Sequence, residues 1–507
     1  MRGKSRFAAV SMFLSSWQRH SHHCKATITF NRAEGALNFM SSLIIIGAGP
    51  GGYKTALHAA KHGLKVTLFE AGHVGGTCLN VGCIPTKTYV HSASFDEAVE
   101  RQPQVVEQLR SGIETLLSHP NITLVRERAS FVDAHTVETP SGQRYTAENI
   151  IIATGSSTKY IPVEGVDSPY VVDSTGLLAL KELPKRLCII GAGVIGMEFA
   201  SVFNRFGSEV TVVEFLKECL PAIDSDIAKR LRKQLEKQGI KFYMGAGVKS
   251  LSPATVPDGS PTGSISVTFE QKGKELSVEA DVVLIATGRK PNTEGLNLEA
   301  LGVTLERNGA IHVNDNYEVK AHPLPLPKGG ESQEGVSIAS RGNESPSLGE
   351  GLGVGLHSLY AIGDVNGRQM LAHAAEYQGL HVVNHILGIE DHIRFDVMPA
   401  AIFTTPEAAC VGPSEDQLKE AAVPFECHKA FFRANGKALA MGETEGMVKL
   451  CCEPDEGRLL SCHAYGAHAA DLVQEATAYI TLGATLQQLR ETVHIHPTLS
   501  EVLIEVN

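Results

Sequence analysis

The sequence predicts an α/β fold that contains one strand–turn–helix unit twice, and three observations lead to this class. The chain of 507 residues is too long for a single hydrophobic core. Its 43% hydrophobic and 20% charged residues are typical of globular proteins. LIIIGAGPGG at 43–52 is echoed by LCIIGAGVIG at 187–196, and each is an apolar strand that leads into a glycine-rich turn. We therefore expect several domains, of which two share one architecture.

Composition argues against membrane and nucleic-acid partners. The chain has no apolar run of membrane-spanning length, and its formal net charge of −11 disfavours contact with phosphate backbones. Eight of the ten cysteines are scattered without metal-ligand spacing, so we expect buried or unreactive thiols, no metal site and a reducing compartment such as the cytoplasm. These eight are Cys24, Cys188, Cys219, Cys410, Cys427, Cys451, Cys452 and Cys462.

Residues 1–40 differ in composition from the rest of the chain. They contain several basic residues and a single acidic one, Glu34. This bias leaves open a transit peptide, which would place the protein in the mitochondrial matrix instead of the cytoplasm. The expected first strand, at 43–46, starts just after Met40, so we interpret residues 1–40 as a disordered leader that precedes the folded protein.

The glycine-rich turns predict two dinucleotide-binding sites of the Rossmann type. Each turn has the pattern G-x-G-x-x-G, and the next strand ends in a glutamate 18 residues beyond the third glycine. The glycines allow a tight turn, close approach to a pyrophosphate and helix packing, and the glutamate accepts hydrogen bonds from a ribose. The first site, in an expected domain at 41–156, comprises Gly47, Gly49, Gly52 and Glu70; the second, in a domain at 157–285, comprises Gly191, Gly193, Gly196 and Glu214.

Two further features refine these sites. NIIIATGS at 149–156 and VVLIATGR at 282–289 form a second internal echo, from which we add Gly155 and Gly288 to the expected cofactor-binding residues. The carboxylate of Glu214 would repel a 2′-phosphate, and the following FLKECL offers one lysine and no arginine to neutralise it. The second site is therefore expected to prefer NAD over NADP.

The stretch GGTCLNVGCIPTK at 75–87 places two cysteines, Cys78 and Cys83, five positions apart. A disulfide that closes so small a loop stabilises a protein by only roughly 2 kcal/mol, so a structural role explains it poorly. If a helix starts within 81–87, with Pro85 in its first turn, its dipole favours the thiolate that exchanges with disulfides. The pair is therefore predicted to be redox-active.

A second unusual segment lies within an expected central region at 286–395. Residues 321–355 are nearly half Gly, Pro and Ser, and such a composition cannot bury enough apolar area to offset its ordering entropy. We expect a disordered surface insertion. Because the entropy of loop closure grows only slowly with length, the fold tolerates the insertion if it leaves and re-enters between strands, here expected around 311–319 and at Leu359.

These motifs, together with AIGDVNG at 361–367 and HIHPTLSE at 494–501, resemble the FAD-dependent pyridine nucleotide-disulfide oxidoreductases over residues 42 to about 320 and 357–507. The resemblance implies that the first glycine turn binds FAD and the second binds NAD. It also implies that the chain returns to the flavin at Asp364. A C-terminal α+β dimerisation domain at 396–507 would pair with a second copy, which gives a homodimer with composite active sites.

The resemblance also assigns the catalytic residues. Cys83 would lie against the flavin as the charge-transfer thiolate, and Cys78 would exchange with the substrate sulfur. His496, from the second subunit, would act as general acid and base, with Glu501 fixing its tautomer. Lys87 resembles the lysine near the flavin N5. Further assignments are Glu198 as the ion-pair partner of that lysine, and Thr86 at a position where serine is commoner.

Within this family, the motifs are most similar to those of enzymes that oxidise dihydrolipoamide with NAD⁺, giving lipoamide, NADH and a proton by ping-pong kinetics. The partners would be lipoyl domains of 2-oxo acid dehydrogenase complexes or the glycine cleavage H protein. Two alternatives stay open. A related NAD(P)H-dependent disulfide reductase would act on another substrate; of these, a glutathione-type enzyme would want arginines beyond Glu214, and a mercuric reductase would want terminal cysteines. A catalytically silent structural subunit would bind no flavin.

Overall fold

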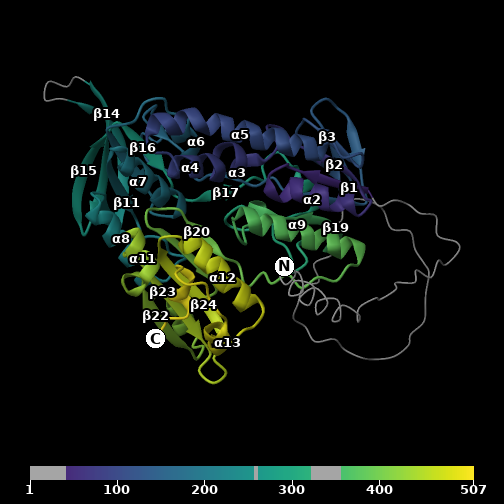
Figure 1. The fold of residues 1–507 in the computed structure, drawn as a ribbon. Coiled ribbons are helices and arrows are strands. Elements are labelled where there is room, and N and C mark those ends of the chain that lie inside the picture. Colours follow the sequence, from purple (N-terminus) through teal and green to yellow (C-terminus); the bar gives the residue numbers. More distant parts are fainter. Residues whose placement is uncertain (1–41, 256–260, 321–354) are drawn as a thin grey trace, which may run out of the picture. The chain divides into compact units, whose positions relative to one another are not determined.

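The computed structural model describes residues 42–255, 261–320 and 355–507 (Figure 1). The leader expected at 1–40 lies outside the described residues, as does the insertion expected at 321–355 apart from Gly355. No helix among the described residues has both the length and the apolar character needed to cross a membrane.

The first glycine turn belongs to a six-stranded sheet with the order β18-β19-β7-β1-β2-β3. The five strands from β19 to β3 are parallel, and the edge strand β18 runs antiparallel to β19. Helices α2 and α9 lie side by side, and both pack against the buried apolar strands (Figure 1). The elements are β1 (Ser42–Ile46), α2 (Pro50–Lys61), β2 (Lys65–Phe69), α5 (Phe95–Leu117), β3 (Ile122–Val125), β7 (Asn149–Ile152), β18 (Glu318–Lys320), β19 (Gly355–Ala361) and α9 (Ala372–Leu387).

The second glycine turn belongs to a five-stranded parallel sheet with the order β12-β11-β10-β16-β9. Its β10–α7–β11 unit repeats β1–α2–β2, which confirms the predicted duplication. The buried face of α7 and the strands of this sheet contribute to a second core. The elements are β9 (Val171–Val172), α6 (Ser174–Leu178), β10 (Arg186–Ile190), α7 (Val194–Phe206), β11 (Glu209–Glu214), α8 (Ser225–Lys237), β12 (Lys241–Met244) and β16 (Val282–Ile285).

The duplication also includes a small antiparallel sheet. In each unit the three strands of this small sheet come, along the chain, just before the strand that leads into the ATG motif. That strand is β7 in the first unit and β16 in the second. Both echoes of the ATG motif therefore follow a strand that re-enters the parallel sheet next to the glycine turn. The antiparallel strands are β4 (Ser130–Asp133), β5 (Thr136–Glu138) and β6 (Arg144–Thr146), then β13 (Ala246–Thr255), β14 (Pro261–Gln271) and β15 (Lys274–Ala280).

The C-terminal part is an α+β domain, as predicted. Its five strands, in the order β20-β21-β24-β23-β22, are all antiparallel, and α12 packs against β21 and β24. The elements are β20 (Ala400–Ile402), β21 (Glu407–Val411), α10 (Glu415–Glu420), β22 (Glu426–Phe431), α11 (Gly436–Met441), β23 (Met447–Cys452), β24 (Leu459–Gly466), α12 (Ala469–Thr481), α13 (Leu486–Glu491) and η4 (Ser500–Leu503).

The residue before the expected insertion and the last residue of that insertion are strand partners. Lys320 at the end of β18 pairs with Gly355 at the start of β19. The strand expected over 311–319 is shorter than predicted: only β18 forms, and Ile311 and Val313 make isolated bridges. The described chain therefore stops and resumes on two neighbouring antiparallel strands.

One expectation about the cysteines was wrong. Cys427 and Cys451 form a disulfide that joins β22 to β23, although both were expected to be unpaired thiols. Strand register explains the difference, because the two residues lie 24 apart in sequence but directly opposite one another in the sheet. The remaining cysteines outside the redox pair that the structure describes are buried free thiols, as expected: Cys188, Cys219, Cys410, Cys452 and Cys462.

A buried lysine connects the C-terminal domain to the second unit. Lys449 on β23 is only 1% exposed, and its Nζ lies 2.6 Å from Asp224 Oδ1 and 2.7 Å from Glu415 Oε2. Asp224 caps α8 through its own side chain. A buried ammonium is expensive unless it is paired, so these contacts hold the two parts of the chain in one arrangement.

Candidate active site

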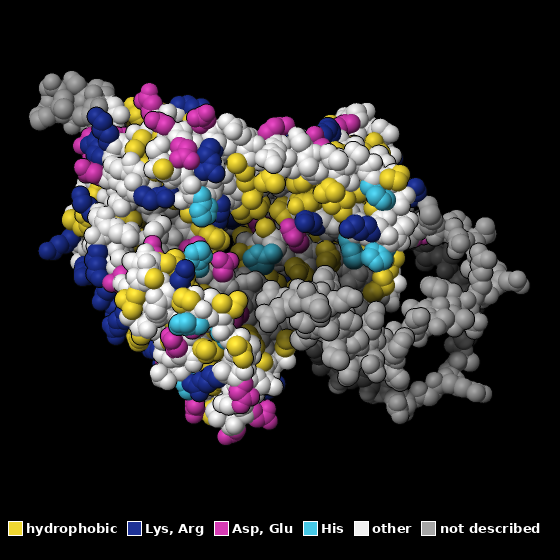
Figure 2. Space-filling model, in the orientation of Figure 1, with side chains coloured by type: hydrophobic (Ala, Val, Ile, Leu, Met, Phe, Trp, Pro, Cys, Tyr) yellow, Lys and Arg dark blue, Asp and Glu magenta, His cyan; other side chains and the backbone are white. Residues whose placement is uncertain are grey.

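A cleft of about 2380 Å³ collects most of the residues that the sequence analysis singled out. Its walls come from both parallel sheets, from the helices around the cysteine pair and from the C-terminal domain. The face drawn in Figure 2 is hollowed, and hydrophobic side chains gather along the hollow. The predicted residues that line the cleft are Gly47, Gly49, Glu70, Cys78, Cys83, Lys87, Gly155, Gly191, Gly193, Glu198, Glu214, Gly288 and Asp364.

The glycine turns have the shape that a dinucleotide requires. A Cβ added at Gly49 would meet no protein atom within 4 Å, so the backbone is open to the cleft. A Cβ added at Gly52 would overlap the carbonyl oxygen of Gly47, whose φ is +105°. Gly52 lines no part of the cleft and is required by packing alone. The second turn has the same geometry at Gly191, Gly193 and Gly196.

The two glutamates at the strand ends are held against these turns. Glu70 accepts hydrogen bonds from the N–H groups of Ala48 and Gly72, both at 2.8 Å. Glu214 accepts from the N–H groups of Ala192 at 2.5 Å and Leu216 at 2.7 Å. Each carboxylate is thus fixed at the edge of the cleft with acceptor capacity left for a ribose hydroxyl. The residues present therefore fit two dinucleotides, one at each turn.

Asp364 joins the two halves of the cleft through polar contacts. It lies in η2 (Gly363–Asn366), and it accepts a hydrogen bond from the Ser156 hydroxyl beside Gly155. Arg289, next to Gly288, donates to Ser156 Oγ at 2.6 Å and lies 3.7 Å from Asp364. The loops after β7 and β16 are therefore connected at the residue where the chain returns to the first sheet.

The two cysteines lie on consecutive helices and contact one another. Cys78 is on α3 (Gly76–Val81), and Cys83 is the first residue of α4 (Cys83–Val90), one turn before Lys87. The helix expected within 81–87 thus begins at Cys83, with Pro85 in its first turn as predicted. Both sulfurs are free thiols in the structure.

The surroundings assign the thiolate to Cys83. The pKa of Cys83 is lowered from an ordinary 9.0 to about 7, chiefly by a hydrogen bond donated by the Cys78 thiol and also by the nearby charge of Lys87, although burial and Glu198 raise it. The same hydrogen bond is the main cause that raises the pKa of Cys78, and burial raises that pKa further. Cys83 also has the helix N-terminus beneath it, which favours an anion. At neutral pH the pair therefore carries its negative charge on Cys83.

An ion pair beside the dithiol joins three parts of the chain. Lys87 Nζ lies 2.8 and 2.9 Å from the two carboxylate oxygens of Glu198 on α7, which is buried. The N–H of Phe403, just after β20, donates to the same carboxylate at 2.9 Å. The Phe403 ring lies 4.5 Å from Lys87 Nζ. The lysine ammonium is thus held over the cleft by contacts from the second unit and from the C-terminal domain.

The predicted histidine lies away from this cleft. His496 Nδ1 is 2.8 Å from Glu501 Oε1, and Thr498 N–H donates to the other oxygen of Glu501. The His496 side chain is 80% exposed and does not line the cleft of its own chain. His494, by contrast, is anchored within its own domain by Glu475 and the Thr492 carbonyl. The pairing of His496 with Glu501 is present, but a single chain does not bring it to the cysteines.

Sequence reasoning missed three residues of the cleft. Ser156 and Arg289 belong to the quoted ATGS and ATGR motifs, so each followed a predicted glycine directly and could have been proposed. Phe403 carried no signal in the sequence, because its role depends on the C-terminal domain packing against α4 and α7.

Comparisons with known proteins agree with this geometry. Residues 41–323 match the family model for pyridine nucleotide-disulphide oxidoreductase, and residues 398–506 match its dimerisation domain. The chain is 36% identical to "Dihydrolipoyl dehydrogenase, mitochondrial" of Pisum sativum over 92% of this chain and 90% of that protein. It is also 36% identical to "Leghemoglobin reductase" of Glycine max, over 92% and 86%. The HOCl-induced flavoprotein disulfide reductase RclA of Escherichia coli matches with a TM-score of 0.78 at 30% identity, over 92% and 99%.

Proposed function

The chain belongs to the pyridine nucleotide-disulphide oxidoreductase family, and from this premise we propose that it is a dihydrolipoamide:NAD⁺ oxidoreductase. The observation that carries the proposal is the pair of free thiols in the same cleft as both glycine turns. The alternatives, a related reductase with another substrate and a catalytically silent subunit, have no specific observation in their favour.

The chain takes FAD and NAD as its cofactors, in line with its family. We assign FAD to the turn at Gly47 and NAD to the turn at Gly191, because the cysteine helices belong to the first unit and directly follow its strand β2. When bound, FAD supplies the two-electron carrier between the dithiol and NAD⁺. The residues of the chain hold the two dinucleotides by their pyrophosphates and riboses and keep the thiols within the same cleft.

The cysteines perform the exchange with substrate. In the oxidised enzyme a substrate thiolate attacks the sulfur of Cys78, and the Cys78–Cys83 bond breaks to leave Cys83 as a thiolate. The second substrate thiol then attacks the substrate sulfur of the mixed disulfide. Cys78 leaves as a thiol, and the substrate departs as a cyclic disulfide. The lowered pKa of Cys83 makes it a good leaving group in the first step.

A base must remove the substrate protons, and we assign this role to His496 with Glu501 as its positioning residue. The exposed imidazole and its absence from the cleft of its own chain support delivery from a second copy, and the dimerisation domain supports a homodimer. The carboxylate of Glu501 holds Nδ1, which leaves Nε2 to take and return the proton.

Lys87 and Glu198 act next to the thiolate rather than on the substrate. The ammonium of Lys87 lowers the pKa of Cys83, and Glu198 opposes this effect while it fixes the lysine in place. The Lys87–Glu198 ion pair therefore influences how readily Cys83 carries a negative charge, at the end of the cleft where electrons leave the dithiol.

The dithiol donor is proposed to be carried by a lipoyl domain, either of a 2-oxo acid dehydrogenase complex or of the glycine cleavage H protein. The names of the dihydrolipoyl dehydrogenase relatives support a lipoamide-type substrate. For the compartment we retain the cytoplasm, with the mitochondrial matrix as the alternative that the relatives named mitochondrial support. Microscopy of the full chain and of a variant that starts at Met40, each fused to a fluorescent protein at the C-terminus, separates the two.

Two parallel activity assays test the proposed function. The purified enzyme is supplied with dihydrolipoamide and NAD⁺, and separately with glutathione disulfide and NADPH. We expect rapid NADH formation in the first mixture and little turnover in the second. Turnover confined to glutathione disulfide and NADPH would contradict the proposed substrate, and a colourless protein without flavin absorbance would favour the silent subunit.

A further inference from the structure

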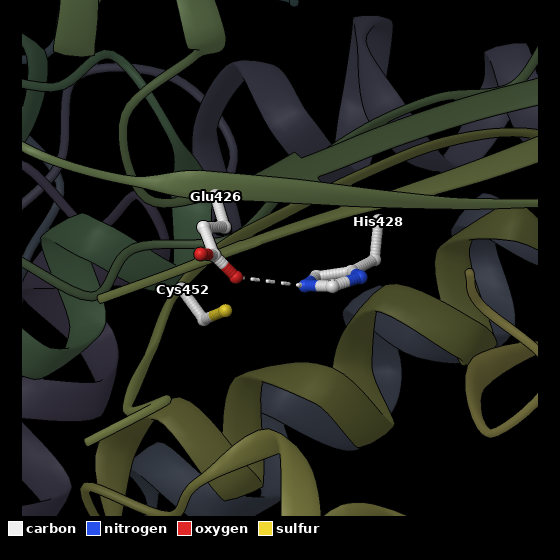
Figure 3. Close-up of side chains that lie close together, drawn as sticks. All are labelled: Glu426, His428 and Cys452. Atoms are coloured by element: carbon white, nitrogen blue, oxygen red, sulfur yellow. Dashed lines mark ion pairs between the residues drawn. The ribbon is translucent and has the colours of Figure 1, made fainter. Parts of the chain in front are cut away.

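We propose that Glu426, His428 and Cys452 form a binding site for a borderline divalent transition-metal ion such as Zn²⁺, separate from the dinucleotide cleft. Figure 3 shows the three side chains pointing toward one another. One possible ligand atom from each lies within 4.8 Å of the others. None of the three residues lines the cleft.

The sheet register creates this cluster. Glu426 on β22 and Cys452 on β23 are direct partners across an antiparallel pair, and His428 lies two residues beyond Glu426 on the same face of the sheet. The register between β23 and β24 shifts between Cys451 and Cys452, and such irregularities redirect side chains next to functional sites. The three ligands come from two strands that are distant in the sequence, so no spacing motif in the sequence indicates the site.

The three side chains have no competing partners of their own. Among the described residues no side-chain hydrogen bond engages Glu426, His428 or Cys452. The Nε2 atom of His428 is 3.8 Å from Glu426 Oε2, which is too long for a hydrogen bond. Cys452 is only 2% exposed. Three possible ligand atoms therefore lie close together, with the thiol at the buried end of the cluster.

The donor set and the distances select the class of ion. A thiolate, an imidazole and a carboxylate are ligands of Zn²⁺ and similar ions, whereas Mg²⁺ and Ca²⁺ prefer oxygen. In a tetrahedral zinc site neighbouring ligand atoms are about 3.3–3.8 Å apart. Side-chain rotations that move the ligand atoms by about 1 Å would therefore bring these three residues to zinc-binding distances. Three protein ligands leave the fourth position to water.

The neighbourhood supports such a site. The Cys427–Cys451 disulfide occupies the adjacent pair of opposed residues and fixes the register of the two strands. Its side chains lie on the opposite face of the sheet, so they do not block the cluster. Arg490 is the nearby cation, and its guanidinium donates to the Val506 carbonyl at 2.6 Å. The strands thus present the ligands in one fixed arrangement.

Zinc binding to the full-length holoenzyme tests the proposal. The enzyme is kept oxidised so that Cys78 and Cys83 are joined and do not compete for metal. Zn²⁺ is then added against a chromophoric chelator, and the metal retained after gel filtration is counted. We expect one Zn²⁺ per chain, with affinity lowered at least about 10-fold in Glu426→Gln, His428→Gln and Cys452→Ser. X-ray absorption at the zinc edge should show one sulfur ligand that Cys452→Ser lacks.

His468→Gln is the matched control. His468 pairs with Asp471 at 3.3 Å on the surface of the same domain, without a thiol in the group. This variant should bind zinc as the wild type does. Equal zinc retention in wild type and all three ligand variants, or none in the wild type, would overturn the proposal. If Cys452→Ser fails to retain flavin, the Glu426 and His428 variants, at the more accessible side of the cluster, decide the question.

Discussion

Lys87 Nζ lies 2.8 and 2.9 Å from the two carboxylate oxygens of Glu198, 111 residues further along the chain. This ion pair connects α4, which begins with Cys83, to α7 of the second unit. The two charges act on the Cys83 thiol with opposite signs, because Lys87 lowers its pKa and Glu198 raises it. The thiol pair is therefore tuned by a contact between domains.

Opposite pKa changes should follow when either charge is removed. Lys87→Met should raise the pKa of Cys83 above its value of about 7, and Glu198→Gln should lower it, each by about one unit. The measurement is the rate of iodoacetamide alkylation of the reduced enzyme across pH 5–10. Lys290→Met is the control, because Lys290 also lines the cleft but pairs with the exposed Glu294. Shifts of the same sign in both variants would show that the pair acts only as a structural contact.

Mixed dimers should reveal whether His496 acts across subunits. Cys83→Ser and His496→Gln should each be inactive alone. Because His496 does not line the cleft of its own chain, a dimer of one subunit of each kind would contain one intact site. Co-expression should therefore restore about a quarter of wild-type activity for random pairing.

The control for this experiment pairs Cys83→Ser with Cys78→Ser. Both substitutions damage the dithiol of a single chain, so no mixed dimer has an intact site and activity should stay at background. Failure of the first pair to exceed the second, with dimers confirmed by differently tagged subunits, would rule out a composite site.

Substitution of Glu70 and Glu214, the glutamates at the two strand ends, should show which glycine turn binds which cofactor. Glu214→Gln replaces one carboxylate oxygen by an amide that cannot accept a hydrogen bond, which should raise the KM for NAD⁺ about 10-fold and leave the flavin content unchanged. Glu70→Gln should instead weaken flavin retention on dialysis. Loss of flavin in Glu214→Gln, with unchanged flavin in Glu70→Gln, would reverse our assignment of FAD and NAD.

The buried lysine between domains should matter for stability. Lys449→Ala leaves buried Asp224 without its partner and should lower the free energy of unfolding by about 3–5 kcal/mol. Lys429→Ala is the control: it removes a more exposed pair with Asp226 and should cost about 1 kcal/mol or less. Urea denaturation at neutral pH measures both, and equal effects would contradict a special role for the buried pair.

The same variant should respond to acid in a defined direction. Lys419 and then Lys449 lower the pKa of Glu415 from 4.5 to about 2. A carboxylate with a lowered pKa stabilises the folded protein fully above 4.5, and this contribution disappears as the pH falls toward 2. The stability difference between wild type and Lys449→Ala should therefore shrink over this range. A difference that grows on acidification would contradict the assignment.

Removal of residues 321–354 should leave catalysis intact. Lys320 and Gly355 are strand partners, so a short Asn-Gly turn can join them. Shortening the loop should stabilise the protein by up to about 2 kcal/mol through a smaller closure entropy. Steady-state kinetics and urea denaturation check both points. Loss of activity with retained flavin would show that the segment contributes to function.

Local sequence patterns were sufficient for most of the cleft. The turn at Gly47 needs a positive φ, and Gly52 leaves no room for a Cβ, so the residue types identify the geometry without the rest of the fold. The position of Cys83 at a helix start was also local, because Pro85 in the first turn and the preceding glycine define it. What such patterns lack is any information on how distant segments meet.

The sequence by itself therefore determined the duplicated α/β units, the paired cysteines and the residue types that hold the two dinucleotides, because these depend on a few neighbouring residues. The tertiary structure alone decided that Phe403 meets the Lys87–Glu198 pair, that Cys427 bonds to Cys451, and that Glu426, His428 and Cys452 converge. Each of these depends on strand register or domain packing. Both are set by the sum of many weak contacts across the core, which no short stretch of sequence encodes.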